Sequence, residues 1–467
     1  TYYYFGNQYP QFLSFMSGAF WSGNVKTAPA ARMGIQPTDE LVWRTWAESY
    51  TATNAVNALI DGMLESSITE NMKNYILGEA YFLRAVLYFN AVRIWGAVPL
   101  RLHPATADNV DMARTPVAEV YAQVIKDLEQ AKLFMPEPTA QVKGRPHKYA
   151  AYSLLAKVYL TLAGNEQGSP YWEKAYAEAI KVYNSGAYRL VRPFKDLWDV
   201  NKENSVESIF EIQYTTAGGP NNGLTQSWMP TNSQYITGAG SPLARVRLHK
   251  MTFDDHRNTY PGDPRIDASY IHTSYRNKTN TSTTLIYPSP TATAANGYPY
   301  LLKYNDPSWV ANGSNTNFPY LRYADVLLML AEIENELRGP AGAFKYINEV
   351  LHRARDANGN GTIEATETSP ADWSGMSQST FRERIILERR IELVGEVHEF
   401  FDIRRRGEAY LLKYFQQHNA HPMFNATNDY LFPTDQASIK RLMLMPIPSD
   451  EINANLLIPP SEQNFGY

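Results

Sequence analysis

The residues with the most specific chemistry lie between Asp356 and Glu367, in the run DANGNGTIEATE. This run matches the calcium loop of EF-hand proteins, which places oxygen ligands at loop positions 1, 3, 5, 7, 9 and 12 and a glycine at position 6. The glycine is Gly361, and the oxygen donors are Asp356, Asn358, Asn360, Thr362 (through its backbone carbonyl), Glu364 and Glu367. We therefore expect a structural Ca2+ here, and the alternative is a polar turn that binds no ion.

A second candidate group is a run of carboxylates that paired acids of a glycosidase could supply. Its members are Glu388, Glu392, Glu396, Glu399 and Asp402. The same segment carries several arginines, and Asp402 and Arg406 are spaced as an i,i+4 ion pair, which favours a salt-bridged helix surface over a catalytic pair. Because the sequence also contains no phosphate-binding loop, nucleophile elbow or zincin motif, we predict that the protein is not an enzyme.

Aromatic residues in loops form the third group, in a chain with 32 Tyr and 9 Trp. Sugar rings pack their C–H faces on Trp and Tyr, and their hydroxyl groups need Asp, Asn, Gln or Arg nearby. The candidates for ligand binding are Asp39, Trp43, Trp228, Tyr235, Tyr298 and Trp309. For each aromatic residue, burial in the core is the alternative to ligand stacking.

Composition excludes several classes of function. The 43 basic and 47 acidic residues give a net charge of −4, so no basic surface for nucleic acid is expected. The absence of Cys excludes disulfides, thiolate metal sites and thiol nucleophiles within this sequence. No apolar run is long enough to span a bilayer.

The elements that must position these residues are mainly helical. The stretch 76–100 is apolar on nearly every face, which predicts a helix packed on both sides and ending at Gly96. Amphipathic pairs joined by short turns predict a tetratricopeptide-like (TPR-like) scaffold. Its expected helices are 40–63, 76–95, 117–135, 148–162, 171–183, 323–337, 341–355, 380–394 and 398–414. Residues 1–38 are expected to be irregular because Gly and Pro interrupt every period.

The predicted organisation is one mostly α domain spanning 1–467. The helical scaffold occupies 40–185 and 320–415, and a loop-rich, ligand-binding subregion occupies 186–319. Short strands are expected at 208–214 and 283–288, and an irregular C-terminal segment at 416–467.

Motifs along the chain resemble those of the SusD/RagB family, the surface lipoproteins of Bacteroidetes nutrient-uptake systems. The stretches are GEAYFLRAVLYFNAVRIWGAVPL (78–100), YLRYADVLLMLAEIENEL (320–337), RIILERRIELVGEVHEFFDIRRRGE (384–408) and PIPSDEINANLLIPPSEQNFGY (446–467). They follow the family's order and cover most of the chain. Phe465 stands where the family usually has Pro.

The resemblance implies a non-catalytic, surface-exposed lipoprotein of the outer membrane that binds a glycan. It also implies a partner, a SusC-like TonB-dependent outer-membrane transporter that receives the glycan. Membrane contact would be made only through a lipid anchor on an N-terminal Cys, which this chain lacks. A peptide-binding, RagB-like lipoprotein and a TPR-like protein-interaction scaffold remain the alternatives.

Overall fold

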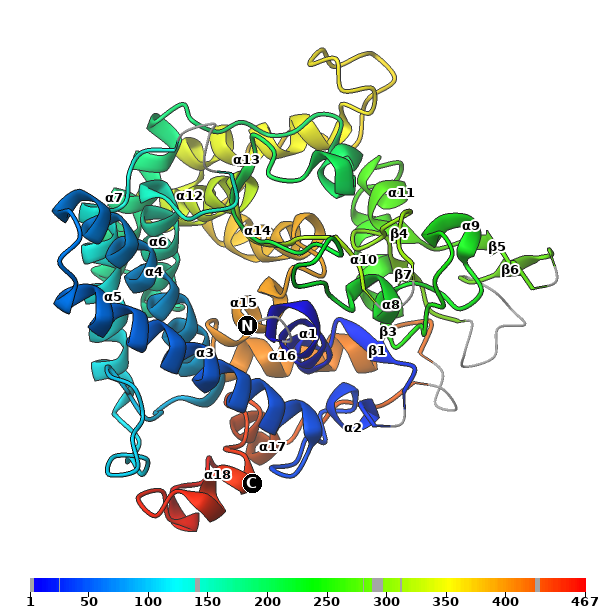
Figure 1. Ribbon diagram of the computed structural model, residues 1–467. Helices are drawn as coiled ribbons and strands as arrows, with labels where there is room; N and C mark the ends of the chain where they lie inside the picture. The colour runs from blue at the N-terminus through cyan, green and yellow to red at the C-terminus, as the bar shows by residue number, and fades with distance from the viewer. Residues whose placement is uncertain are drawn as a thin grey trace. The chain divides into compact units, whose positions relative to one another are not determined.

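The computed structural model (Figure 1) describes residues 4–24, 26–138, 143–279, 281–287, 297–310, 313–424 and 429–467. Contacts between Cα atoms divide the chain into two compact units. Ile35–Tyr188 and Asp435–Tyr467 belong to the first unit, and Tyr2–Gly34 and Arg189–Thr434 belong to the second. The boundary at Tyr188 lies near the predicted end of the first helical segment.

The first unit is an array of helices. Its long helices are α3 (Glu40–Glu65), α4 (Glu70–Trp95), α5 (Val117–Phe134), α6 (Lys148–Ala163) and α7 (Tyr171–Asn184). The chain returns with α17 (Gln436–Arg441), α18 (Ser449–Ala454) and the 3-10 turn η4 (Pro460–Glu462). Consecutive helices pack against each other, so α3 contacts α4, α4 contacts α5, and α6 contacts α7.

Helix α4 confirms the expectation of a helix packed on both sides. Its second half is buried around the whole circumference, and it contacts α3, α5 and α6. The helix ends at Gly96, whose φ of 76° is unfavourable for residues with a side chain. Its N–H donates to the carbonyl of Val92 at 3.0 Å.

The second unit combines helices, short strand pairs and loops. Its helical elements begin with the π-helical turn η1 (Tyr4–Gln8), α1 (Tyr9–Ser17) and α2 (Ala28–Ala31). Its middle part contains the 3-10 turns η2 (Phe194–Trp198) and η3 (Val200–Lys202), and α8 (Leu224–Trp228), α9 (Gln234–Thr237), α10 (Lys250–Thr259) and α11 (Arg265–Ser269). The last helices are α12 (Tyr323–Arg338), α13 (Pro340–Arg355), α14 (Gln378–Glu392), α15 (His398–Arg404) and α16 (Glu408–Asn419).

The strands of the second unit form antiparallel pairs that join distant segments. They are β1 (Phe20–Ser22) with β3 (Val246–Leu248), β2 (Ser208–Ile212) with β8 (Phe318–Arg322), β4 (Tyr270–Ile271) with β7 (Tyr300–Leu301), and β5 (Ser274–Arg276) with β6 (Thr283–Leu285). The predicted strand pieces at 208–214 and 283–288 contain β2 and β6, although Pro288 lies outside the described residues. In the pair formed by β2 and β8, Phe210 lies opposite Leu321.

Three sequence-based expectations about regular structure are wrong. Residues 1–38 contain α1, a helix that is buried along its whole length, so its apolar residues do not show a one-sided period. The expected helix 398–414 is two helices, because Gly407 has a φ of 87° and begins α16. The C-terminal segment contains α17 and α18 instead of being irregular throughout.

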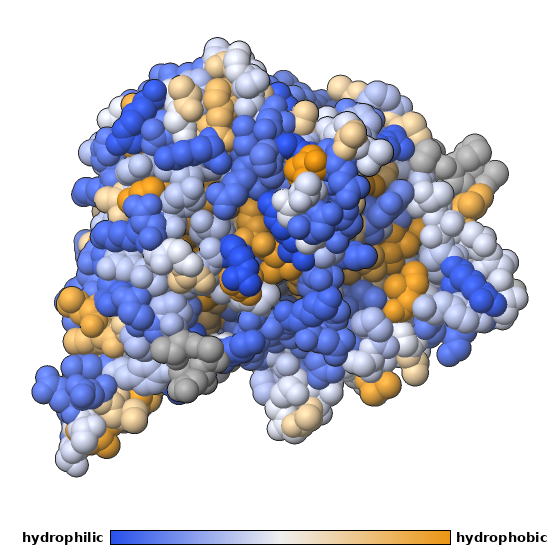
Figure 2. Space-filling view, turned by 90° about the horizontal axis from the view of Figure 1, so that it is seen from above, coloured by the Kyte–Doolittle hydropathy of each residue, from blue (hydrophilic) through white to orange (hydrophobic). Residues whose placement is uncertain are grey.

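No helix within the described ranges is sufficiently long and apolar to cross a membrane. Figure 2 shows a face of the molecule on which hydrophilic residues predominate, with hydrophobic residues in scattered patches.

Candidate ligand-binding site

A cavity in the second unit lies beside η2, and we call it the η2 pocket. Its volume is about 670 Å³, within the range typical of small-molecule sites. The residues that line it come from segments 193–201, 264–268, 302–307 and 354–357. It therefore lies where the loop-rich stretch after the first helical segment meets the C-terminal end of α13.

Local sequence explains how η2 presents two aromatic rings to this pocket. Pro193 precedes the turn and has no N–H to leave unpaired, which suits the start of a helical turn. Phe194 and Trp198 are one turn apart, and their rings meet edge to face with centroids 5.9 Å apart. After Trp198, the side chain of Asp199 accepts the N–H of Asn201 at 3.0 Å and begins η3.

Trp198 separates the η2 pocket from a much smaller cavity of about 30 Å³, because it lines both. The ammonium nitrogen of Lys303 lies 4.4 Å from the centroid of the Trp198 ring, a cation–π contact. Lys303 lines the small cavity and not the η2 pocket. The cation therefore lies over the half-buried indole, and the same indole also lines the η2 pocket.

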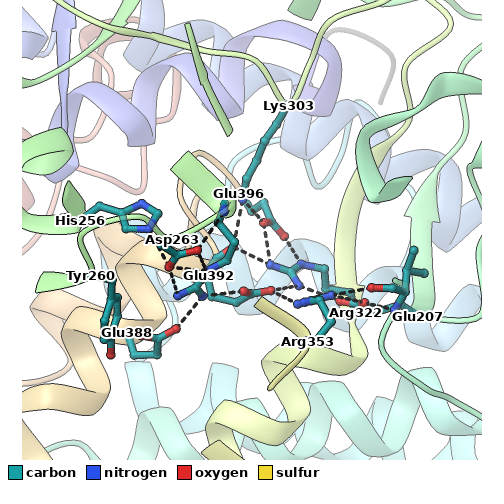
Figure 3. A network of polar contacts seen from close by, with 12 residues as sticks. Glu207, His256, Tyr260, Asp263, Lys303, Arg322, Arg353, Glu388, Glu392 and Glu396 are labelled. Atoms are coloured by element: carbon teal, nitrogen blue, oxygen red, sulfur yellow. Dashed lines mark hydrogen bonds and ion pairs between the residues drawn. The ribbon is translucent and has the colours of Figure 1, made fainter. Parts of the chain in front are cut away.

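A buried network of charges, drawn in Figure 3, contacts Phe194 and Trp198, which we call the aromatic floor of the pocket. Arg322 donates from Nη1 to Glu392 at 2.7 Å and to Glu207 at 2.8 Å, and from Nε to Glu396 at 2.6 Å. Lys303 donates to Glu396 at 2.8 Å. These side chains are buried, so water screens their attraction weakly.

The network continues through two further arginines. Arg353 bridges Glu207, at 2.7 Å, and Glu392, and its guanidinium carbon lies 4.9 Å from the Phe194 ring centroid. Arg265 donates to Glu392 at 2.9 Å. Burial by itself would raise the pKa of Glu392, but Arg353, Arg322 and Arg265 outweigh burial and hold that pKa well below its usual value.

These contacts correct the expectation of a salt-bridged helix surface. Glu388 and Glu392 are fully buried, and their partners come from other elements of the second unit. Asp402 pairs with Arg389 at 2.7 Å and Arg405 at 2.9 Å, and not with Arg406, whose nearest recorded carboxylate is Glu332 at 3.5 Å. Glu388, Glu392, Glu396 and Asp402 are thus buried and charge-paired. Glu399 is also buried but has no basic partner among the described contacts, and its Oε1 accepts the N–H of Gly395 at 2.7 Å. The segment therefore has no exposed carboxylate pair for a substrate.

Polar groups around the η2 pocket could bind the hydroxyl groups of a ligand. Among its lining residues are four carboxylates and one ammonium, belonging to Asp196, Asp199, Asp267, Asp356 and Lys195. Three polar atoms of lining residues are buried without a hydrogen-bond partner, namely Trp198 Nε1, Asn305 Oδ1 and Asp356 Oδ1. Unpaired buried polar atoms are costly, so their grouping around one pocket suggests contact with water or a ligand.

Three of the predicted ligand-stacking residues are buried in the second unit. The exposed fractions of Trp228, Tyr298 and Trp309 are 0%, 1% and 1%. Trp228 packs edge to face on Phe20, and Tyr298 stacks on Trp21 with ring centroids 4.5 Å apart.

Trp309 is packed against the backbone at Gly240, where a Cβ atom would lie 2.3 Å from ring atom Cε3. The structure therefore contradicts ligand stacking by Trp228, Tyr298 and Trp309, and their burial in the core, which the sequence left open, is what it shows. The three rings belong to the packed interior rather than to a shared ligand site.

The other predicted ligand-binding residues do not join the η2 pocket. Tyr235 is 52% exposed, with the guanidinium carbon of Arg276 4.3 Å from its ring centroid. In the first unit, Trp43 is 36% exposed on α3. Asp39 precedes α3, where its Oδ2 accepts the N–H of Gln36 at 2.7 Å and makes no capping bond to the helix. Ligand binding by these three residues stays a prediction.

The predicted calcium loop follows α13 and reproduces several internal bonds that its template requires. Asp356 Oδ2 accepts the N–H of Gly361 at 3.0 Å, and Asn358 Oδ1 accepts the N–H of Asn360 at 2.9 Å. Asn360 Oδ1 accepts the N–H of Thr362 at 2.7 Å. Gly361 has a φ of 82°, as the sharp turn requires.

Carboxylates at the two ends of this loop are held in place. Glu367 accepts the N–H of Ala357 at 2.9 Å with Oε1 and that of Glu364 at 3.0 Å with Oε2, which draws the ends together. Arg192 pairs with Asp356 at 2.5 Å. Burial would raise the pKa of Asp356, but Arg192 and the N–H of Gly361 hold it below its usual value, so the carboxylate is ionised.

Trp198 is the functional candidate that the sequence did not single out. Its flanking acids in DLWD were the available signal, because they repeat the pattern of an aromatic ring beside carboxylates. Its cationic support could not be inferred, since Lys303 is distant in sequence and reaches Trp198 only through the fold.

Comparisons with known proteins cover nearly the whole chain. The model described as "SusD family" matches residues 201–467, and the one described as "Starch-binding associating with outer membrane" matches residues 8–160. SusD-like protein P2 of Formosa agariphila is 29% identical over 408 residues, which cover 83% of this chain and 76% of that protein.

Solved structures show the same fold. A SusD homolog from Bacteroides thetaiotaomicron has a TM-score of 0.81 at 24% identity and covers 99% of this chain and 95% of its own. A laminarin binding SusD-like protein has a TM-score of 0.74 at 21% identity, with 98% and 94% of the two chains covered. The predicted mostly α, SusD-like fold is thus confirmed, and the chain belongs to the SusD family.

Proposed function

We propose that this protein is a non-catalytic, cell-surface glycan-binding protein of the outer membrane that passes oligosaccharide to a SusC-like TonB-dependent transporter. Support comes from the family and from the matched description of starch-binding proteins that associate with the outer membrane. A relative with the same fold is described as laminarin binding. Delivery to the transporter rests on the family resemblance alone.

The observation that carries glycan binding is the half-buried Trp198 ring in the η2 pocket. Lys303 lies over the ring, and the pocket that the ring lines is surrounded by carboxylates and amides. An aromatic face combined with hydrogen-bonding groups suits a sugar ring, whose C–H face is apolar and whose edge is polar. The network beneath holds the indole in position before the ligand arrives, which reduces the ordering cost of binding.

Charge around the pocket favours a neutral glycan. The lining carboxylates outnumber the single lining ammonium, that of Lys195. Lys202 is paired with Asp196 at 2.9 Å. A sulfated or uronic-acid polysaccharide would bring like charges together in a concave site, which disfavours its binding. We therefore place neutral oligosaccharides ahead of anionic ones as ligands of this site.

Affinity gel electrophoresis with neutral and anionic polysaccharides tests the proposal. We expect retardation by at least one neutral glycan and a loss of on the order of tenfold in affinity for Trp198→Ala. The control is Leu64→Ala, an exposed apolar residue of α3, for which we expect no comparable loss. Circular dichroism and thermal unfolding establish that the Trp198 variant folds. A wild-type chain that no glycan retards, but that binds basic peptides, would replace this proposal with the peptide-binding alternative.

Transfer to a transporter is tested separately by chemical cross-linking on cells that produce the protein. We expect a TonB-dependent outer-membrane transporter among the cross-linked partners by mass spectrometry. Repeated recovery of other proteins without any transporter would favour the interaction-scaffold alternative.

A further inference from the structure

We propose that residues 356–367 bind one calcium ion, and that this ion fixes the wall of the η2 pocket formed by Asp356 and Ala357. Ion binding stands on the loop alone, and the effect on the pocket rests on the proposed glycan-binding function. Both residues line the pocket, and both belong to the loop that extends outward after α13 in Figure 1.

The first argument is an unpaired ligand atom. Asp356 is 1% exposed, and its Oδ2 is already bound by Gly361 and Arg192. Its Oδ1 is buried and has no hydrogen-bond partner. A buried carboxylate oxygen without a partner is costly in free energy, and a cation at Oδ1 would remove that cost. Because Arg192 contacts the other oxygen, the ion and the guanidinium need not compete for the same atom.

The second argument is the arrangement of the remaining donors. The side-chain oxygens of Asn358 and Asn360 accept hydrogen bonds from backbone N–H groups of the loop, and both carboxylate oxygens of Glu367 do the same. A carbonyl or carboxylate oxygen that accepts one N–H keeps a second lone pair for a metal. The bond from Ala357 to Glu367 places the loop's last ligand beside its first residues, as a twelve-residue calcium loop requires.

The donor set also determines which metal the loop suits. Across the described residues, no three His, Cys, Asp or Glu side chains converge on one metal position, which argues against zinc and similar ions. The loop does not need three acids, because its direct ligands are two carboxylates, two amide oxygens and one backbone carbonyl, with Glu364 acting through water. A set of about seven oxygen ligands that includes a bidentate carboxylate suits Ca2+ better than the strictly octahedral Mg2+.

The ion would stabilise the pocket by joining its wall to the distal part of the loop. Without it, Asp356 is held through Arg192 and Gly361, and Ala357 through Glu367. With it, the oxygens of Asp356 and Glu367 share one centre, and Glu367 also accepts the N–H of Ala357. The ion therefore restricts the motion of Asp356 and Ala357 relative to η2. The pocket would then be more rigid before the ligand binds, so less conformational entropy would be lost on binding.

Isothermal titration of Ca2+ into the full chain, after removal of divalent ions with EGTA, tests ion binding without any glycan. We expect one site with a dissociation constant on the order of 10⁻⁴ M, as in extracellular calcium modules. Glu367→Gln should weaken binding by ~10-fold or more, because it removes a bidentate carboxylate. Glu65→Gln, an exposed acid of α3, is the matched control and should titrate like the wild type.

Asp356→Asn is the second variant and should also weaken binding, although it disturbs the pair with Arg192 as well. No heat of binding up to millimolar Ca2+, or unchanged binding in both loop variants, overturns the site. The influence of the ion on the η2 pocket is measured by affinity gels run with Ca2+ or with EGTA. We expect the glycan to retard the protein more strongly with Ca2+ than with EGTA. Equal retention by a chain that binds the ion overturns the role at the pocket, whereas absence of all retention contradicts the proposed function instead.

Discussion

The ammonium group of Lys303 connects Trp198 to Glu396: its nitrogen lies 4.4 Å from the indole ring centroid and 2.8 Å from Oε1 of the carboxylate. The buried network therefore contacts Trp198, a residue that lines the η2 pocket. Burial lowers the pKa of Lys303, but Glu396 opposes that shift and helps retain the proton. Support for the pocket floor is consequently electrostatic as well as steric.

Replacing that lysine tests this connection. Lys303→Met keeps the length of the side chain and removes its charge, while Glu396 retains Arg322 as a partner. We expect the free energy of unfolding to fall by about 1–3 kcal/mol, because the carbonyl of Glu392 and one oxygen of Glu396 lose a donor. Glycan retention should also weaken, since one face of Trp198 loses its cation.

Lys413→Met is the matched control for this measurement by urea unfolding. Lys413 pairs with Glu383 at 2.7 Å, but both side chains are more than half exposed, so the expected change is within about 0.5 kcal/mol. Equal effects of the two substitutions would show that the buried network does not support the pocket floor.

The carboxyl group of Glu203, which lines the small cavity together with Trp198, should make the stability of the fold depend on pH. Burial raises the pKa of Glu203 to about 8, helped by the nearby charge of Glu211 and opposed by the N–H of Asn317. A carboxyl whose pKa is higher in the folded state binds its proton more tightly there. Its contribution to stability is therefore complete below the unfolded-state pKa of 4.5 and is lost as the pH rises through about 8.

Glu203→Gln should remove this dependence, because the amide keeps an oxygen for Asn317 and carries no proton to lose. We expect the variant to gain thermal stability over the wild type as the pH increases from 5 to 9. Melting temperatures measured across that range check the prediction. A difference that is constant with pH would show that Glu203 has an ordinary pKa.

Some of this architecture is readable from sequence for a physical reason. Helix α4 could be predicted from its own residues, because the spacing of its apolar residues indicates a helix and Gly96 indicates its end. The charged segment of α14 and α15 could not be placed, because i,i+4 spacing of acids and arginines is the same on a solvated surface and in a buried network. Which one forms depends on Arg265, Arg322 and Arg353, which are remote in sequence.

The candidate site also has one part that the sequence can predict and another part that only the fold determines. Residues 356–367 could be proposed as a calcium loop because all their candidate ligands are local and the spacing of the motif is fixed. Aromatic residues carry no such signal, since a Trp in a Gly-rich loop can pack inward or outward. Trp309 packs against Gly240, and only the fold determines that contact.

The tight contact between Gly240 and Trp309 makes a second stability prediction. A methyl group at Gly240 would lie 2.3 Å from the indole, so Gly240→Ala should destabilise the fold by about 1–3 kcal/mol. Gly62→Ala is the control with the opposite sign. It lies within α3 with no atom near an added Cβ, so it should stabilise by about 0.5–1 kcal/mol. Thermal unfolding compares the two. A fully stable Gly240→Ala variant would mean that Trp309 can leave its buried position, which would reopen its predicted role in ligand binding.

The first unit offers an independent test through a buried ion pair on α4. Arg84 binds Asp127 of α5 with two hydrogen bonds of 2.8 and 2.9 Å, and both residues are at most 5% exposed. Asp127→Asn should lower the free energy of unfolding by about 3–5 kcal/mol, because it leaves the guanidinium of Arg84 without a buried counter-charge.

The paired replacement Arg84→Met with Asp127→Leu separates the cost of an unpaired charge from the value of the pair. We expect the double variant to be more stable than Asp127→Leu alone, because no buried charge remains. Urea unfolding gives the comparison, with Glu40→Gln as a control, since its partner Arg44 is 38% exposed and the pair should contribute less than about 0.5 kcal/mol. If the two substitutions destabilise additively, Arg84 and Asp127 do not act as a pair, and packing between α4 and α5 alone holds these helices together.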